Sequence, residues 1–485
     1  MNYVCIFLAC LAGAGVARVL FPAPLRWSLH NAWVLSLGGG AGIAIASSLY
    51  FLCLALIGPN VALLAAVEGV FVLAAVALAI VLKKQGPVFE WAAGPEPPGY
   101  LTIGLLLAAA IALGIFVSSS IYKPHGEWDA WSIWNLRARF LYRGGGSWRD
   151  AFSPFIPWAH PDYPLLIPGI VAMSWTLSHL ESTAAPIATA FVFTFGLAGL
   201  FIATIGILRG KAQAYVAGIL LLGTVSVSQV GAYQYADVPL GFFFLASLAL
   251  LCLQDRHPEE TRFTVLAGLA AGFGAWTKNE GLLFATVLLV ARAIAIFRYG
   301  RRPTLLAQIG RLVAGMVAPL AMFAFFKIRY APSNDLLSTP AGEALKRLVN
   351  IGRWLTTFEG LVPNLFRIGS FLLPVILVLA LYWYLVRFKV EERDRSALGT
   401  VVLAVALMMA GNIGVYIMLA PDVEWQVRTS IERLYLQLWA PALLAFFLAA
   451  NPPQLVARET TVEKEKKGKP AKRSAKQPRR GVETR

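Results

Sequence analysis

Charged side chains are scarce in this sequence. Only 14% of its 485 residues are Asp, Glu, Lys or Arg, whereas about 25% of the residues in a soluble domain are charged. Hydrophobic residues make up 58% of the chain, and a water-soluble fold of this length has too little interior to bury them. This balance excludes soluble globular, disordered and coiled-coil classes, and it indicates a protein whose main solvent is lipid.

Cysteine is equally rare, and it carries no metal or disulfide pattern. The four cysteines all lie inside apolar runs without CxxC spacing, which is typical of small packing residues: Cys5, Cys10, Cys53 and Cys252. The sequence also lacks a Walker loop, a GxGxxG that opens a βαβ unit, and an HExxH motif. ATP-driven and zinc-hydrolase functions therefore have no support, and no metal site is predicted.

Long apolar runs dominate what is present. They are continuous and show no period-two alternation, so they predict membrane-spanning helices and not a barrel. About 20 residues suffice for one crossing. Thirteen spans are expected, at 3–21, 33–57, 61–82, 101–120, 186–208, 212–229, 237–254, 262–277, 279–297, 307–327, 366–387, 397–420 and 434–450.

The positions of the cations predict the orientation of these spans. Lys and Arg gather in alternate connections, which the positive-inside rule assigns to the cytoplasm. The tail at 451–485 has the same parity; from Gln454 onward it holds eleven Lys and Arg against four acids. We expect this tail to be disordered, cytoplasmic and attracted to anionic lipid, and not to bind nucleic acid.

The chain divides into six segments on this basis. Two long outer loops, at 121–185 and 331–365, separate N-terminal helices at 1–120, a core at 186–330 and C-terminal helices at 366–450 from the tail at 451–485. The helical stripe of Trp128, Trp131, Trp134, Ala138 and Leu141 predicts an interfacial helix in the first loop.

Two further helices are expected on the outer face. Residues 163–180 form an apolar stretch that we interpret as a re-entrant helix, because a full crossing would invert half of the topology. The second outer loop predicts an amphipathic helix with Thr339 as N-cap and Pro340 at its first position, followed by Leu345, Leu348, Leu355 and Phe358 on one face.

Charged side chains of the outer loops are the candidate site, because charges at a membrane are functional candidates by default. A carboxylate can deprotonate a hydroxyl, while Lys and Arg hold a phosphate and stabilise it as it leaves. Transfer from a lipid phosphate fits this set, which comprises Glu127 and Asp129 in GEWDAW, His160 and Asp162 in HPDYP, Asp237 in YADVP, Lys278 and Glu280 in WTKNEG, and Arg428 and Arg433.

Simpler structural roles compete with each assignment. Asp129 would suit a helix N-terminus, Asp237 could be an N-cap, and His160 could cap the re-entrant helix. Lys278 could snorkel or pair locally with Glu280, and the two arginines could contact lipid headgroups.

The order of these motifs resembles the GT-C class of membrane glycosyltransferases, over roughly 126–441. It is most similar to bacterial proteins related to protein O-mannosyltransferases and aminoarabinose transferases. The resemblance implies Asp129 as catalytic base, with Glu127 as substitute, and Asp237 as a second acid. It implies that Lys278 and Arg433, with His160, contact the donor phosphate; Glu280 and Arg428 complete the binding set.

The function implied by this resemblance is inverting transfer of a sugar from a polyprenyl-phosphate donor to a hydroxyl. The acceptor is a glycan, lipid or protein at the outer face of a bacterial inner membrane. Some related enzymes need a divalent metal, but no ligand cluster supports one here. A transporter or flippase, or a ligase of lipid-linked saccharides, remains the alternative; a transporter predicts broken or charged helices near the midplane.

Overall fold

The fold is described from a computed structural model that covers residues 2–22, 28–81, 96–300, 302–333, 339–368, 374–420 and 422–453. Within these residues the chain is helical, and the single β-type pairing is an isolated bridge between Phe388 and Ala450. The N-terminal helices are α1 (Asn2–Leu20), α2 (Leu29–Leu56), α3 (Val61–Val81), α4 (Gly99–Tyr122), α5 (Asn135–Arg143) and α6 (Leu166–Ser178).

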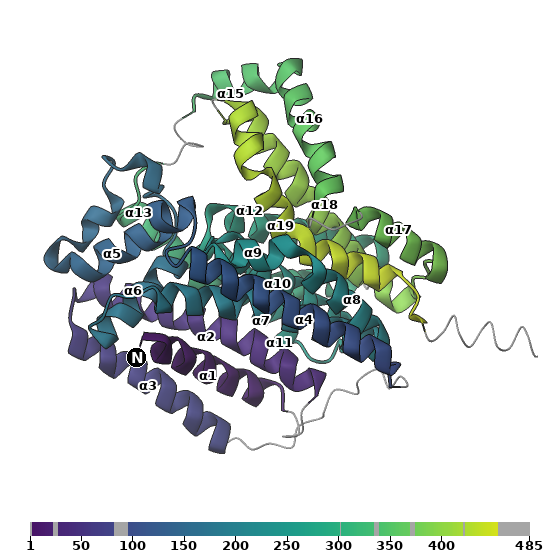
Figure 1. Cartoon of the computed structure of the whole chain (residues 1–485), viewed down its shortest axis with the longest axis horizontal. Helices are drawn as coiled ribbons and strands as arrows, with labels where there is room; N and C mark the ends of the chain where they lie inside the picture. The colour runs from purple at the N-terminus through teal and green to yellow at the C-terminus, as the bar shows by residue number, and fades with distance from the viewer. Residues whose placement is uncertain are drawn as a thin grey trace, which may run out of the picture.

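The remaining helices form the core and the C-terminal part of the bundle (Figure 1). They are α7 (Ala184–Arg209), α8 (Lys211–Gly223), α9 (Val225–Ala232), α10 (Asp237–Arg256), α11 (Arg262–Thr277), α12 (Asn279–Tyr299), α13 (Leu305–Arg329), α15 (Ala341–Leu348), α16 (Ile351–Arg367), α17 (Val375–Val386), α18 (Arg395–Met418) and α19 (Val423–Ala449). Short turns are η1 (Ala130–Trp134, a π-helix), η2 (Gly145–Phe152), η3 (Pro157–Ala159), η4 (Arg302–Thr304) and η5 (Glu392–Asp394).

Ten helices of the described ranges are long and apolar enough to cross a membrane, so the chain is a multi-pass membrane protein. A bent pair raises this number to eleven, because α8 and α9 meet at an angle of 54°. The two other expected spans fall short: α11 has 16 residues and α17 has 12. The predicted total of thirteen is therefore not confirmed within the described residues, and residues 369–373 of the expected span at 366–387 lie outside them.

The helix α10 lies at the centre of the bundle. Its membrane-length window is completely buried, and it packs against α7, α11 and α19. A helix that is apolar on all sides needs such a position. By contrast, α3 and α4 bury less than a fifth of their windows. The first residue of α10 is Asp237, so the centre of the fold places an acid at one end of the bundle.

Glycines allow several helices to approach closely. A Cβ on Gly42 of α2 would overlap the Ala9 carbonyl of α1, and a Cβ on Gly268 of α11 would overlap the Leu312 carbonyl of α13. Small residues at crossings are the usual route to tight packing in membranes. Figure 1 shows α1, α2 and α3 side by side along one edge of the molecule.

The second outer loop differs from the single helix that was expected. It contains α15 and α16, with Pro340 and Asn350 at their N-cap positions, so the assignment of Thr339 as N-cap is wrong. Both helices project with α18 and α19 at the top of Figure 1. Arg353 anchors this projection, because it donates hydrogen bonds to the carbonyls of Tyr416, Ile417 and Ala420 at the end of α18.

The first outer loop also departs from the expectation of one exposed stripe. Trp128 and Trp131 are exposed, but Trp134, Ala138 and Leu141 are buried in the core. The apolar helix expected at 163–180 is α6, which has 13 residues and packs against α2 and α5. Thirteen residues span only about 20 Å, which is too short for a crossing; re-entry from the outer side stays a prediction.

Candidate active site

Asp237 is the innermost acid of the candidate site. Its carboxylate Oδ1 accepts hydrogen bonds from Lys278 Nζ at 3.2 Å and from Gln437 Nε2 at 2.5 Å. Ala236 occupies the N-cap position of α10, and Asp237 makes no capping hydrogen bond. Asp237 therefore connects Lys278 with α19, and the simpler interpretation as an N-cap is wrong; its implied part as a second acid stays a prediction.

Lys278 occupies the tight turn between α11 and α12. A Cβ on Gly281 would overlap the backbone at Gly274, so a glycine is needed for the two helices to turn this closely. The Lys278 ammonium also contacts Glu280 Oε1 at 2.7 Å, and the residue is buried. Burial alone would lower the pKa of Lys278, but the carboxylates of Asp237 and Glu280 outweigh it and raise the pKa. Lys278 therefore does not snorkel to the surface.

Asp129 and Arg433 form the outer pair of the site. Asp129 Oδ2 contacts Arg433 Nη1, and both side chains keep about a fifth of their surface exposed (17% and 21%). The Tyr235 ring lies 5.2 Å from the Arg433 guanidinium. Asp129 precedes the π-helical turn η1 without capping it. The position agrees with a helix N-terminal acid, but the contact that the Asp129 side chain makes is with Arg433.

One face of α19 joins the two pairs. Arg433 and Gln437 are four residues apart and lie above one another on the helix; the first contacts Asp129 and the second contacts Asp237. The result is a line of polar side chains that runs from the partly exposed Asp129 through the buried Asp237 and Lys278 to the partly exposed Glu280. Helices α10, α12 and α19 and the turn η1 all contribute to it.

Four of the predicted site residues lie outside this line, and one of them, Asp162, contacts Asn279 and Lys327 instead. Glu127 pairs with Lys123, four residues earlier in the turn after α4, and both are solvent-accessible. Arg428 is exposed on α19, five residues before Arg433, and α19 begins at Val423, ahead of the expected span at 434–450. His160 has a left-handed backbone (φ 43°) and stacks on Tyr163, with ring centroids 4.7 Å apart.

Several residues of the site were not expected from the sequence. Gln437, Tyr235 and Tyr163 line it, and the Tyr163 ring centroid lies 6.0 Å from Lys278 Nζ. The signal for Gln437 was available, because it lies one turn after Arg433 in an otherwise apolar stretch. Tyr163 follows Asp162 in HPDYP, and burial, reinforced by the Glu280 carboxylate, raises its pKa.

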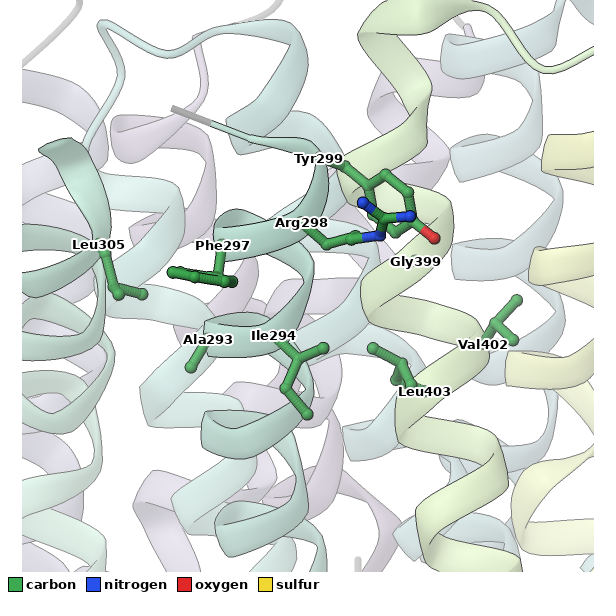
Figure 2. Close-up of a pocket in the computed structure, with 9 residues that line it drawn as sticks. All are labelled: Ala293, Ile294, Phe297, Arg298, Tyr299, Leu305, Gly399, Val402 and Leu403. Atoms are coloured by element: carbon green, nitrogen blue, oxygen red, sulfur yellow. The ribbon is translucent and has the colours of Figure 1, made fainter. Parts of the chain in front are cut away.

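A pocket of about 660 Å³ lies far from this line of charges. It opens between α12, α13 and α18, and Figure 2 shows Ile294, Phe297, Arg298 and Tyr299 among the residues that line it. These residues end α12, whereas Asn279 begins it, and 21 residues of helix separate the two ends by about 30 Å. The pocket is mainly apolar and holds none of the predicted site residues.

The described residues contain no group of three or more His, Cys, Asp and Glu side chains arranged to hold a metal ion. The acids of the site face cations instead: Asp129 faces Arg433, and Asp237 and Glu280 face Lys278. What the arrangement offers chemically is a partly exposed carboxylate that can accept a proton, beside a partly exposed guanidinium that can bind an anion.

Comparisons with protein-family models, with curated proteins and with solved structures found no match to this chain. The resemblance to GT-C glycosyltransferases therefore rests on the residues and their order alone.

Proposed function

We propose that this protein is an inverting glycosyltransferase that moves a sugar from a polyprenyl-phosphate donor to an acceptor hydroxyl at the outer face of a bacterial inner membrane. The observation that supports this most is the Asp129–Arg433 pair, with about a fifth of each side chain exposed, at one end of a membrane bundle. It combines a base and an anion-binding group within contact distance, where a lipid phosphate can meet a hydroxyl.

The geometry suggests how the donor would prepare the base. A phosphodiester that binds the Arg433 guanidinium competes with Asp129 for it, and bidentate contact with phosphate favours the exchange. The released Asp129 carboxylate then lies beside a negative charge, which makes it a stronger base. The acceptor hydroxyl gives its proton to Asp129 and its oxygen attacks the anomeric carbon. The bond from that carbon to phosphate breaks, and polyprenyl phosphate leaves with the electron pair.

Lys278 has a supporting role in this scheme. Its ammonium is buried and held between Asp237 and Glu280, so it is less accessible than Arg433. We expect it to stabilise the site electrostatically as charge develops on the leaving phosphate. Direct phosphate contact is expected mainly from Arg433.

The transfer reaction is tested with the purified full-length chain in nanodiscs. Radiolabelled polyprenyl-phosphate sugars, offered with membrane extract, should pass label to an acceptor. Absence of transfer from every donor by folded protein would overturn the proposal.

A transporter is the second candidate because of the broken span α8–α9, which bends by 54° beside Thr224. Discontinuous helices are typical of transporters. At this break, however, the Thr224 hydroxyl donates a hydrogen bond to the Leu220 carbonyl and accepts one from Trp439 Nε1. The line of charged side chains lies elsewhere. Uptake of a fluorescent lipid-linked sugar into vesicles without glycosyl transfer would favour this alternative.

A further inference from the structure

A second polar cluster lies beside the candidate active site. It joins the HPDYP turn to α5, α12 and α13. Asp162 accepts a hydrogen bond from Asn279 Nδ2 at 2.7 Å, and Lys327 Nζ donates to the Asp162 carbonyl at 2.5 Å and contacts its carboxylate at 3.4 Å. Arg137 lies on the same side with its Nη1 3.5 Å from the Pro164 carbonyl, and it has no exposed surface.

This cluster is incompletely satisfied. In the described part of the chain, Nε and Nη2 of Arg137 and Oδ1 of Asn279 have no hydrogen-bond partner, although all three atoms are buried. Leaving buried polar atoms unpaired is costly, and native proteins rarely tolerate it without a reason. Two donors and one acceptor are therefore available to a bound molecule.

The charges of the cluster point to the same conclusion. Arg137 and Lys327 bring two positive charges against the single carboxylate of Asp162, which leaves one excess positive charge. Burial lowers the pKa of Arg137 to about 9, and Asp162 opposes this shift, so the guanidinium stays protonated at neutral pH. A buried excess charge is unfavourable unless it is paired.

The cluster borders the line of catalytic candidates. Asn279 stands between Lys278 and Glu280 in the chain, and Tyr163 follows Asp162. The Tyr163 ring faces Lys278 on one side and stacks on Trp134, with centroids 5.6 Å apart. Tyr163 and the first turn of α12 thus belong to both clusters, and a molecule of saccharide size that reaches Lys327 lies next to the candidate active site.

We propose that Arg137, Lys327 and Asn279 form a subsite for the carboxylate of an acidic saccharide, the class of acceptor that the proposed transfer reaction would use. The claim that this saccharide is the acceptor rests on the proposed function. The claim that the subsite binds a saccharide carboxylate does not. One excess positive charge matches a singly charged carboxylate better than a doubly charged phosphate monoester. The Asn279 amide oxygen accepts a hydrogen bond from a neighbouring sugar hydroxyl, and Lys327, with 20% of its side chain exposed, lies at the entrance.

The test measures binding of simple probes to purified full-length protein, by thermal shift and calorimetry. Glucuronate should stabilise the protein, glucose should not, and glucose 6-phosphate should bind more weakly than glucuronate. Lys327→Gln should weaken glucuronate binding about tenfold or more, because a hydrogen bond to a charged group is lost. Lys346→Gln, which alters an exposed lysine of α15, should leave binding unchanged.

Two further variants distinguish a loss of binding from a loss of folding, and the subsite from the proposed function. Arg137→Lys keeps the positive charge but loses the planar guanidinium with its paired N–H donors. It should weaken glucuronate binding while the protein remains folded. Asp129→Asn should leave glucuronate binding intact while it abolishes sugar transfer. If the wild-type protein binds glucuronate but transfers no sugar, the proposed function is refuted and the subsite is kept. Equal responses to glucose and glucuronate, tighter binding of glucose 6-phosphate, or unchanged binding by folded Lys327→Gln would each overturn the subsite.

Discussion

The two ends of the bundle hold their charges in different ways. At the end predicted to face the cytoplasm, Arg256 donates hydrogen bonds of 2.8 Å to both carboxylate oxygens of Asp394. Arg292 donates to both carboxylate oxygens of Asp255, at 2.5 and 2.9 Å. At the other end, Arg433 contacts Asp129 through one oxygen, and both side chains remain partly exposed.

This difference separates structural charges from exchangeable ones. Bidentate pairs satisfy both partners and resist replacement. Arg292 is further held by Gln308 at 2.6 Å and lies near Ser396 and Thr400, so α12, α13 and α18 are tied together. The Asp129–Arg433 pair has one contact and is partly exposed, so a ligand can reach it. The comparison predicts that substitutions at the Asp129–Arg433 end lower turnover. Substitutions at the end that holds the bidentate pairs should lower the stability of the fold.

The largest expected effect belongs to Asp129→Asn. The amide keeps the size of the side chain but cannot accept the acceptor proton. Turnover should fall about 10²–10⁴-fold, the usual contribution of a general base, while the unfolding temperature stays near that of the wild type. Steady-state kinetics with a short-chain donor measure this effect; near-normal turnover would remove Asp129 from the mechanism.

A somewhat smaller effect is expected for Arg433→Gln. Stabilisation of the leaving phosphate is greater in the transition state than in the ground state, so turnover should fall about 10²–10³-fold and donor affinity less. Arg433→Lys should recover only part of the rate, because a point charge does not reproduce the guanidinium fork. Equal losses in turnover and donor affinity would instead indicate uniform binding.

The opposite end should respond in stability. Arg256→Gln breaks the bidentate contact and leaves the buried Asp394 with Arg209 at 3.6 Å. We expect the free energy of unfolding to fall by about 1–3 kcal/mol, with turnover per folded molecule unchanged. Denaturation followed alongside activity tests this, and lost turnover at unchanged stability would contradict the division between the two ends.

The smallest effect is expected for Glu127→Gln. Glu127 lies two residues from Asp129 but pairs only with Lys123 at the surface. Such pairs contribute about 0–1 kcal/mol, so stability and turnover should both stay close to wild type. The variant is a matched control for Asp129→Asn, and an inactive Glu127→Gln would transfer the role of base to Glu127.

The sequence predicted the helical membrane class and ten of the spans, because long apolar runs have few other solutions in lipid. It did not predict the bend between α8 and α9 or the shortness of α11 and α17, which depend on packing. The division into segments stays a prediction, and the tail from residue 454 lies outside the described residues.

The candidate site shows the same limit. Motif order placed Asp129, Asp237, Lys278, Glu280 and Arg433 in one set, and the structure brings these five together. Motif order could not separate these five residues from Glu127 and Arg428, because the exposure of those two depends on how the chain is packed. Gln437 could have been found one helical turn after Arg433, whereas the unsatisfied Arg137 becomes visible only when α5 is packed.

The anomeric configuration of the product tests the central claim most directly. A donor of defined anomer, a purified acceptor and the full-length protein are incubated, and the new glycosidic bond is assigned by nuclear magnetic resonance. A single displacement with Asp129 as base predicts an inverted anomer in the wild type and no product from Asp129→Asn. A retained anomer would require a covalent intermediate and would contradict the mechanism built on the Asp129–Arg433 pair.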